Sequence, residues 1–293
     1  MKKLFSAVIA VLVALPLSAA TFQEVNKLIK EKKWSDAEVS CRQLISEVKK
    51  DNDKYLAYMK LMIIMRRLNK NAELIKDADT FLAECKNDKH AADLLIYKGI
   101  GQRSIKEYAS ALDSFKLAVD KAKEGNIARE AAFYYMDTAP GVKKFAEAQE
   151  MYQRVKSLKD VDKDARLLLG ASYIYWYNNK YDEAWEILEL AGKIEKLTVI
   201  QKETLLRYRG NIMYNTKKYD EALKYFDQAL ALEISSYSAC RINYYKAQTL
   251  EKLKRYEDAL AAYKAVLEYK DETYFKRASA VSIERISKKI KGE

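Results

Sequence analysis

Residues that interrupt helices are scarce in this chain, whose 293 residues include two prolines and eight glycines. Little material is therefore left for β-turns. A single histidine, His90, excludes a zinc site built on two histidines. The three cysteines, Cys41, Cys85 and Cys240, are an odd number without metal-ligand spacing, which disfavours a disulfide framework. Cys41 stands at a core-type helical position, so we interpret it as a small buried hydrophobe.

Long apolar runs are also missing beyond residue 20. The one such run, Leu4 to Leu15, follows two lysines and precedes Pro16 and the small residues Ser18-Ala19-Ala20. This order is typical of a cleavable signal peptide and is too short for a membrane span. Thr21 rather than cysteine follows the expected cut, so a lipoprotein is not expected. The sequence predicts an exported protein, periplasmic in a bacterium or secreted, with no transmembrane segment in its mature form.

The charge balance favours lysine and arginine. Without Lys2 and Lys3, the chain would keep 51 basic and 42 acidic side chains, mostly interspersed. A solvated cationic surface accounts for this balance. Attraction to acidic peptides, wall polymers or lipid headgroups is the alternative interpretation, whereas the export signal disfavours nucleic acid as a partner.

The most informative feature present is a tetrad of an aromatic residue, two mostly polar residues and alanine. The tetrads begin at Trp34, Tyr108, Phe145, Tyr181, Tyr219 and Tyr256. Their intervals are 74, 37, 36, 38 and 37 residues, and a seventh copy without the aromatic begins at Asn71. A fixed period of this length is typical of stacked helical repeats, which form binding surfaces.

Counting from each tetrad alanine, apolar residues recur at offsets of one, four, seven and eight, which lie on one helical face. After Ala222 they are Leu223, Phe226, Ala229 and Leu230. Twelve residues before the alanine, four copies carry a small residue that permits close helix packing: Gly99, Ser172, Gly210 and Ala247. Each unit is therefore predicted to be two antiparallel helices joined by a short turn.

This pattern resembles the tetratricopeptide repeat over nearly the whole mature chain. The matching residues are Gly99, Tyr108, Ala111, Phe115, Ala118, Gly210, Tyr219, Ala222, Phe226, Ala229, Ala247, Tyr256, Ala259 and Tyr263. The resemblance implies an all-α fold, a right-handed α-solenoid of about seven helix pairs over residues 21–270. The period exceeds the usual ~34 residues by about three, and the family's proline near the end of the second helix is absent.

Two segments depart from the regular pattern. Pro140 stands where the first helix of the fourth unit should continue, so that helix is expected to end near Thr138, with a longer loop before Lys143. Residues 271–293 are expected to form a capping helix with a basic tail.

In proteins that this chain resembles, the first helices of successive units line a concave groove. Transferred to this sequence, the groove-facing positions precede each anchor alanine by 18, 15, 11, 8 and 7 residues. The peptide-binding residues expected on this basis are Tyr173, Trp176, Tyr177, Arg207, Asn211, Tyr214, Arg241, Tyr244 and Gln248. Toward the N-terminus, the same positions hold Met59, Ile63, Arg66, Ile96, Ile100 and Arg103. Arg207 and Asn211 resemble part of a carboxylate clamp, but Tyr245 replaces the clamp's next asparagine.

No pattern predicts catalysis, a metal site or a cofactor. His90 is interpreted as a solvated residue between units, and a Cys85–His90 nucleophile pair lacks an oxyanion loop. The leading hypothesis is a non-enzymatic exported scaffold that binds proteins or peptides, including acidic or C-terminal segments, in a cell-envelope complex. The alternative is an accessory protein that docks on cell-wall polymer or anionic lipid. Self-association through the first or last unit is a further option.

Overall fold

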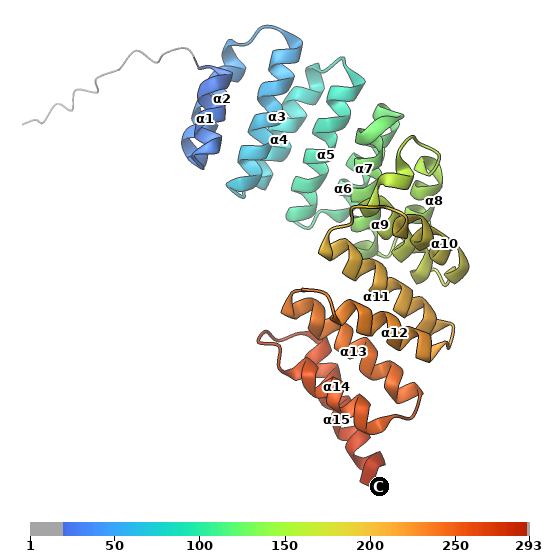
Figure 1. The fold of residues 1–293 in the computed structure, drawn as a ribbon. Coiled ribbons are helices and arrows are strands. Elements are labelled where there is room, and N and C mark those ends of the chain that lie inside the picture. The colour runs from blue at the N-terminus through green and yellow to red at the C-terminus, as the bar shows by residue number, and fades with distance from the viewer. Residues whose placement is uncertain (1–19, 292–293) are drawn as a thin grey trace, which may run out of the picture. The chain divides into compact units, whose positions relative to one another are not determined.

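The computed structural model describes residues 20–291, so the proposed signal peptide lies outside the described residues apart from Ala20. The described chain forms fifteen α-helices, two short 3-10 helices and no strand (Figure 1). It divides into two compact units, residues 1–107 and 108–293, and each is described by itself. The boundary lies between Glu107 and Tyr108, where the third tetrad begins.

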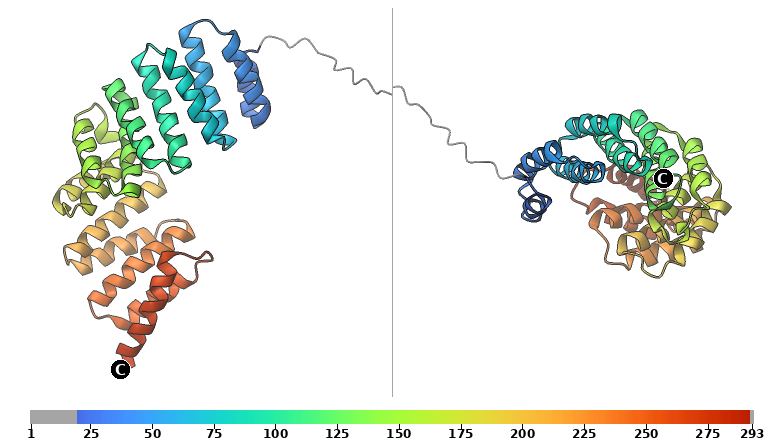
Figure 2. Two further views of the ribbon diagram at one scale, coloured as in Figure 1. Left: turned by 180° about the vertical axis from the view of Figure 1, so that it is seen from behind. Right: turned by 90° about the horizontal axis from the view of Figure 1, so that it is seen from above.

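The first unit contains five helices. They are α1 (Phe22–Lys30), α2 (Trp34–Glu47), α3 (Asp51–Arg67), α4 (Asn71–Glu84) and α5 (Asp88–Ser104). Consecutive helices pack against each other, and α3 also contacts α5, the next first helix. In Figure 2 these blue to teal helices lie side by side in chain order. Leu61, Met62 and Leu74 are fully buried in this core. Burial raises the pKa of the Cys41 thiol to about 12, and Cys41 donates to the Ala57 carbonyl.

The second unit contains the remaining helices. They are α6 (Tyr108–Ala122), α7 (Gly125–Thr138), η1 (Ala139–Val142), α8 (Phe145–Val155), η2 (Val161–Lys163), α9 (Ala165–Tyr177), α10 (Tyr181–Gly192), α11 (Val199–Asn215), α12 (Tyr219–Leu230), α13 (Ser236–Lys252), α14 (Tyr256–Leu267) and α15 (Tyr274–Lys291). The first helices α7, α9, α11 and α13 contact one another in sequence, and α13 contacts α15. This arrangement brings the predicted binding residues onto neighbouring helices.

Each second helix begins at the first residue of a tetrad, including α4 at Asn71. All six tetrad alanines are fully buried, because their small side chains stand where the second helix meets its neighbours. Gly210 fulfils the close-packing prediction, since a Cβ atom added there would lie 2.5 Å from the Phe226 ring. The pattern thus predicted both the start of each second helix and the contact within its pair.

The same turn joins the two helices in all seven repeats. Its middle residue adopts the left-handed conformation, with φ of 57° to 68°, although it is never glycine. These residues are Lys32, Asn69, Lys106, Lys143, Asn179, Lys217 and Lys254. The next amide donates to the carbonyl five residues earlier, as from Lys218 to Met213 at 2.8 Å. This is the Schellman pattern of helix C-termini.

Pro140 does not produce the expected longer loop. Helix α7 ends at Thr138 as predicted, but Ala139–Val142 continues as a 3-10 helix with proline near its start. A proline at that position needs no N–H donor, so the chain continues compactly to the usual turn at Lys143. At the other end, α15 packs on α14 and buries Ile286.

Candidate binding surface

Aromatic side chains connect three helices near the middle of the second unit. The Tyr177 ring of α9 stacks on the Phe145 ring of α8, with centroids 3.5 Å apart and planes 5° from parallel. On α9, Tyr173 contacts Trp176 and Tyr177 at centroid distances of 5.7 and 6.4 Å. Tyr173 also stacks at 5.8 Å on Tyr208 of α11. These side chains therefore form one aromatic strip from α8 to α11.

A second aromatic cluster joins α13 to α15. The Tyr244 ring contacts Tyr245, Tyr263, Tyr274 and Phe275, with centroids 5.4 to 6.2 Å apart. Burial, and then its interaction with Tyr274, raise the pKa of Tyr244. Its hydroxyl also accepts a hydrogen bond of 3.1 Å from the Gln248 amide. Tyr244 is therefore held by the molecule's own residues.

Between the two clusters, one buried carboxylate binds two arginines. Glu203 is 2% exposed and accepts from Arg207 Nε at 3.0 Å and from Arg241 Nη2 at 3.1 Å. Burial opposes the charge of Arg207, but interactions with Tyr208 and Glu203 outweigh it and raise the pKa of Arg207. The Arg207 guanidinium carbon lies 4.4 Å from the Tyr208 ring centroid, and the pair adds a cation–π attraction. The group keeps a net charge of +1.

The nine predicted binding residues differ in accessibility. Arg207, Asn211 and Tyr244 are buried at 7%, 4% and 7% exposure, whereas Tyr177 is 50% exposed. The others are half-buried: Tyr173, Trp176, Tyr214, Arg241 and Gln248. Tyr214 contacts Tyr219 of its own repeat at 5.7 Å, away from the two clusters. Tyr177 and Arg241 are thus better placed to meet a ligand than Arg207 or Asn211.

The sequence interpretation missed three residues that hold this face together, Glu203, Tyr208 and Phe275, and named Tyr245 only as a departure from the clamp pattern. Glu203 precedes Arg207 by four residues, a spacing that favours an ion pair on a helix and could have revealed it.

In the first unit, Ile96 and Ile100 are buried in the core, while Ile63 remains 39% exposed.

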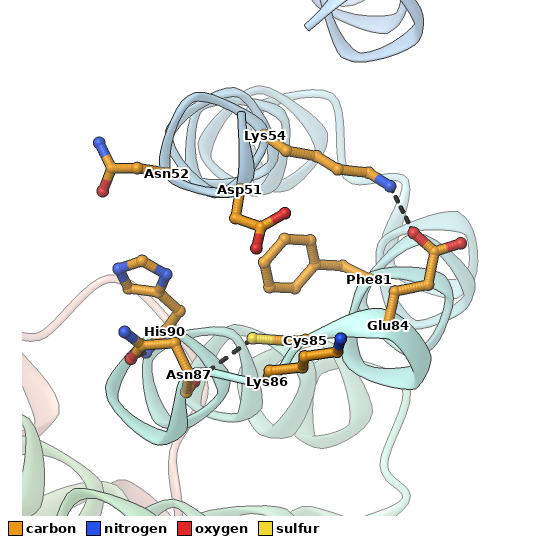
Figure 3. Close-up of a pocket in the computed structure, with 9 residues that line it drawn as sticks. All are labelled: Asp51, Asn52, Lys54, Phe81, Glu84, Cys85, Lys86, Asn87 and His90. Atoms are coloured by element: carbon orange, nitrogen blue, oxygen red, sulfur yellow. Dashed lines mark hydrogen bonds and ion pairs between the residues drawn. The ribbon is translucent and has the colours of Figure 1, made fainter. Parts of the chain in front are cut away.

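The first unit contains a cavity of about 490 Å³ near the connection between α4 and α5 (Figure 3). Its lining includes His90 and Cys85. His90 is half-buried rather than solvated, because its ring stacks on Tyr55 with centroids 3.8 Å apart. The Cys85 thiol donates at 3.3 Å to the backbone carbonyl of Asn87. The cavity therefore does not present the thiol–imidazole hydrogen bond of an activated nucleophile.

Two further findings concern metal binding and membrane crossing in the described residues. Within residues 20–291, no group of three or more His, Cys, Asp or Glu side chains could hold a metal ion. Among the helices described, none combines the length and the apolar character that crossing a bilayer requires.

Comparison with known proteins identifies the repeat. Residues 209–273 match the family model of the tetratricopeptide repeat. A tetratricopeptide repeat protein from Parabacteroides merdae has a similar structure, with a TM-score of 0.60 and 14% identity, over 90% of this chain and 96% of that one. No curated protein matches the sequence significantly.

Two other solved structures are similar. The C-terminal part of a repeat-containing protein from Cytophaga hutchinsonii has a TM-score of 0.59 and 15% identity, over 88% of this chain and 99% of that one. The APC/C hetero-tetramer Cut9-Hcn1 matches with a TM-score of 0.58 and 13% identity, over 92% of this chain but 49% of that one. At these identities the likeness shows the fold alone.

The all-α fold of stacked antiparallel helix pairs, predicted from the tetrads, is confirmed. The match over residues 209–273 and the shared fold support the tetratricopeptide repeat family. This fold supports a role as a scaffold for protein–protein interaction. Scaffolds of the tetratricopeptide repeat family are generally not enzymes.

Proposed function

We propose that this protein is a non-enzymatic exported scaffold that binds an extended segment of a partner protein along the first helices of its second unit. The observation that carries the proposal is the aromatic strip from Phe145 to Tyr208, which leaves Tyr177 half exposed. Large aromatic side chains that keep part of their surface accessible are typical anchors in protein interfaces.

Charge next to the strip favours an acidic or C-terminal segment. The Glu203 group keeps one positive charge, and Arg241 is the more exposed of its two arginines. The guanidinium of a half-buried arginine suits a carboxylate. Arg207 is already engaged by Glu203, so its contribution is to hold the charge in place rather than to contact the partner.

A peptide-display selection against the purified full chain tests this proposal. Selected peptides should bind about tenfold more weakly to Tyr177→Ala, the size of effect expected for an interface anchor. Leu190→Ala is the matched control, since Leu190 is 40% exposed but lies on the second helix α10. Equal affinity for wild type and Tyr177→Ala would show that the strip is not the binding surface.

Export is the second part of the proposal and has its own test. The apolar run and small residues near the N-terminus support cleavage after Ala20. N-terminal sequencing of the protein from the cell envelope should therefore begin at Thr21. A first residue of Met1 would refute processing without affecting the binding surface.

One observation favours docking on an anionic polymer or lipid as a second candidate. The left-handed turn residue and its successor are both basic in four of the seven turns, Lys32-Lys33, Lys143-Lys144, Lys217-Lys218 and Lys254-Arg255. Such docking would weaken steeply with ionic strength, whereas binding by the aromatic strip would not. Co-sedimentation with anionic vesicles at two salt concentrations separates the two functions.

A further inference from the structure

The second unit carries a polar cavity where its longest inter-repeat connections meet. Its volume is about 290 Å³, and it is lined by residues of α7, the α8–α9 connection, α9, the α10–α11 connection and the first turn of α11. The connection from α8 to α9 is nine residues long, 156–164, and that from α10 to α11 is six, 193–198. Both connections contribute charged side chains to the lining.

The lining is predominantly cationic. Arg129, Lys163, Arg166 and Lys196 contribute four positive charges, and Asp160 and Asp164 contribute two negative ones. Lys163 pairs with Asp160 at 2.8 Å, and Arg129 lies 3.6 Å from Asp164. Within the described chain, Arg166 and Lys196 have no carboxylate partner, although Arg166 lies over the Phe133 ring. Two positive charges therefore remain uncompensated.

Arg129 occupies a position that other repeats fill differently. It stands 19 residues before its anchor alanine, where other repeats have the buried residues Ala92, Ala165, Cys240 and Glu203 or the half-buried Tyr55. The Arg129 side chain is 14% exposed and donates to the Lys159 carbonyl, while its Nε atom lies 3.6 Å from the Asp164 carboxylate, in an ion pair longer than a hydrogen bond. Arg129 is therefore balanced by Asp164, and the excess positive charge of the lining comes from Arg166 and Lys196.

We propose that this cavity binds a small oxyanion with two negative charges, of the phosphate class. Hydrogen phosphate or a phosphate monoester carries about −1.5 to −2 at neutral pH, which balances the two uncompensated charges. The guanidinium of Arg166 can bind such an oxyanion through paired hydrogen bonds, and the ammonium of Lys196 can add a single charge-assisted one. The site is separate from the aromatic strip and does not depend on the proposed function.

Isothermal titration of the full chain with inorganic phosphate, at constant ionic strength, tests the site. Saturable binding of one phosphate per chain is expected, weakened about tenfold by Arg166→Gln and by Lys196→Gln through the loss of a charge-assisted hydrogen bond. Lys193→Gln is the matched control, because Lys193 is an exposed lysine of the same region outside the lining. It should bind phosphate as wild type does.

The two sources of phosphate are separated by repeating the titration with glycerol phosphate. Tighter binding of the ester would indicate a phosphorylated molecule, and tighter binding of inorganic phosphate the free ion. No saturable binding of either at millimolar concentration would overturn the proposal, as would equal weakening by Lys193→Gln. Lys196 is exposed, so Lys196→Gln keeps the test valid even if other variants fold poorly.

Discussion

At the scale of single residues, the charge of the binding surface depends on one glutamate. Glu203 is the shared partner of Arg207 and Arg241 in a region where all three side chains are largely removed from water. The group follows a general rule: a buried charge is tolerated when it is paired, and its loss leaves the others uncompensated. Glu203 is thus a positioning residue for the guanidinium of Arg241.

Replacing Glu203 should be far more destabilising than replacing an exposed glutamate. Glu203→Gln leaves two arginines without their carboxylate and should reduce the free energy of unfolding by about 3 to 5 kcal/mol. Glu189→Gln, which breaks the 2.7 Å pair of an exposed carboxylate with Arg209, should cost at most about 1 kcal/mol. Urea unfolding followed by circular dichroism measures both. Similar losses would mean that the Glu203 group is not energetically buried.

Two helical glycines should respond to alanine in opposite directions. At Gly210 an added Cβ would lie 2.5 Å from the ring of Phe226, so Gly210→Ala should destabilise by about 1 to 3 kcal/mol. At Gly170 the nearest atom is 3.8 Å away, an ordinary contact. Gly170→Ala should therefore stabilise by up to about 1 kcal/mol through helix propensity. Thermal unfolding distinguishes the signs, and a gain in stability at Gly210 would contradict the packing.

At the scale of helices and turns, α15 is attached partly through one carboxylate. Glu251 of α13 accepts hydrogen bonds from Arg285 of α15 at 2.9 Å and from the Tyr263 hydroxyl of α14 at 3.1 Å. Burial would raise the pKa of Glu251, but the interaction with Arg285 outweighs burial and holds it below its ordinary 4.5. The attachment of the last helix therefore depends on pH.

The sign follows from the lowered pKa. This contribution to stability is fully present above the unfolded pKa of Glu251, near 4.5, and is lost as the pH falls through the lower folded value. The protection factors of α15 amides, which are corrected for the pH dependence of intrinsic hydrogen exchange, should accordingly fall in acid more than those of α11. In Glu251→Gln, which cannot ionise, this extra pH dependence should disappear. If it persists, another group controls the docking of α15.

A second prediction for helices and turns concerns the stability effect of glycine at the left-handed turn residues. A lysine at φ of 62° is strained, and glycine is not, so Lys217→Gly should stabilise the protein by about 1 kcal/mol. Lys224→Gly, in the middle of α12, should destabilise it by a similar amount. Chemical unfolding of the two variants gives the comparison, and a loss at both positions would argue against strain in the turn.

Sequence periodicity predicted the helices well because each tetrad serves several physical needs at once. Position 222 requires a small residue because it is fully buried, and the apolar residues that follow Ala222 must share one helical face. The binding face stays a prediction, since an offset places a residue on a face without saying what it contacts. Arg207 was expected to meet a ligand, but Glu203 occupies its guanidinium. His90 was expected in solvent, but Tyr55 stacks on it from α3, a distant part of the sequence.

At the scale of the whole molecule, the two compact units should respond separately to core damage. Leu61 is 1% exposed in the first unit, and Leu61→Ala should cost about 2 to 5 kcal/mol there. Stability in repeat proteins is carried by nearest neighbours, so hydrogen-exchange protection should fall in α2 to α4 and remain in α11 to α14. Leu188→Ala, in the second unit, should instead lower protection in the second unit and leave α2 to α4 protected. Uniform loss in both variants would indicate a single cooperative unit.

The seven turns also give the chain a built-in set of protease reporters. Five of them have lysine at the left-handed position, in an exposed peptide that trypsin recognises chemically. The hydrogen bonds of each turn hold that peptide in a tight bend, so cleavage requires local opening. When opening and closing are fast, the cutting rate at a turn reports the free energy of that opening. The order of fragments in a brief digestion would therefore rank the repeats by local stability without any added label.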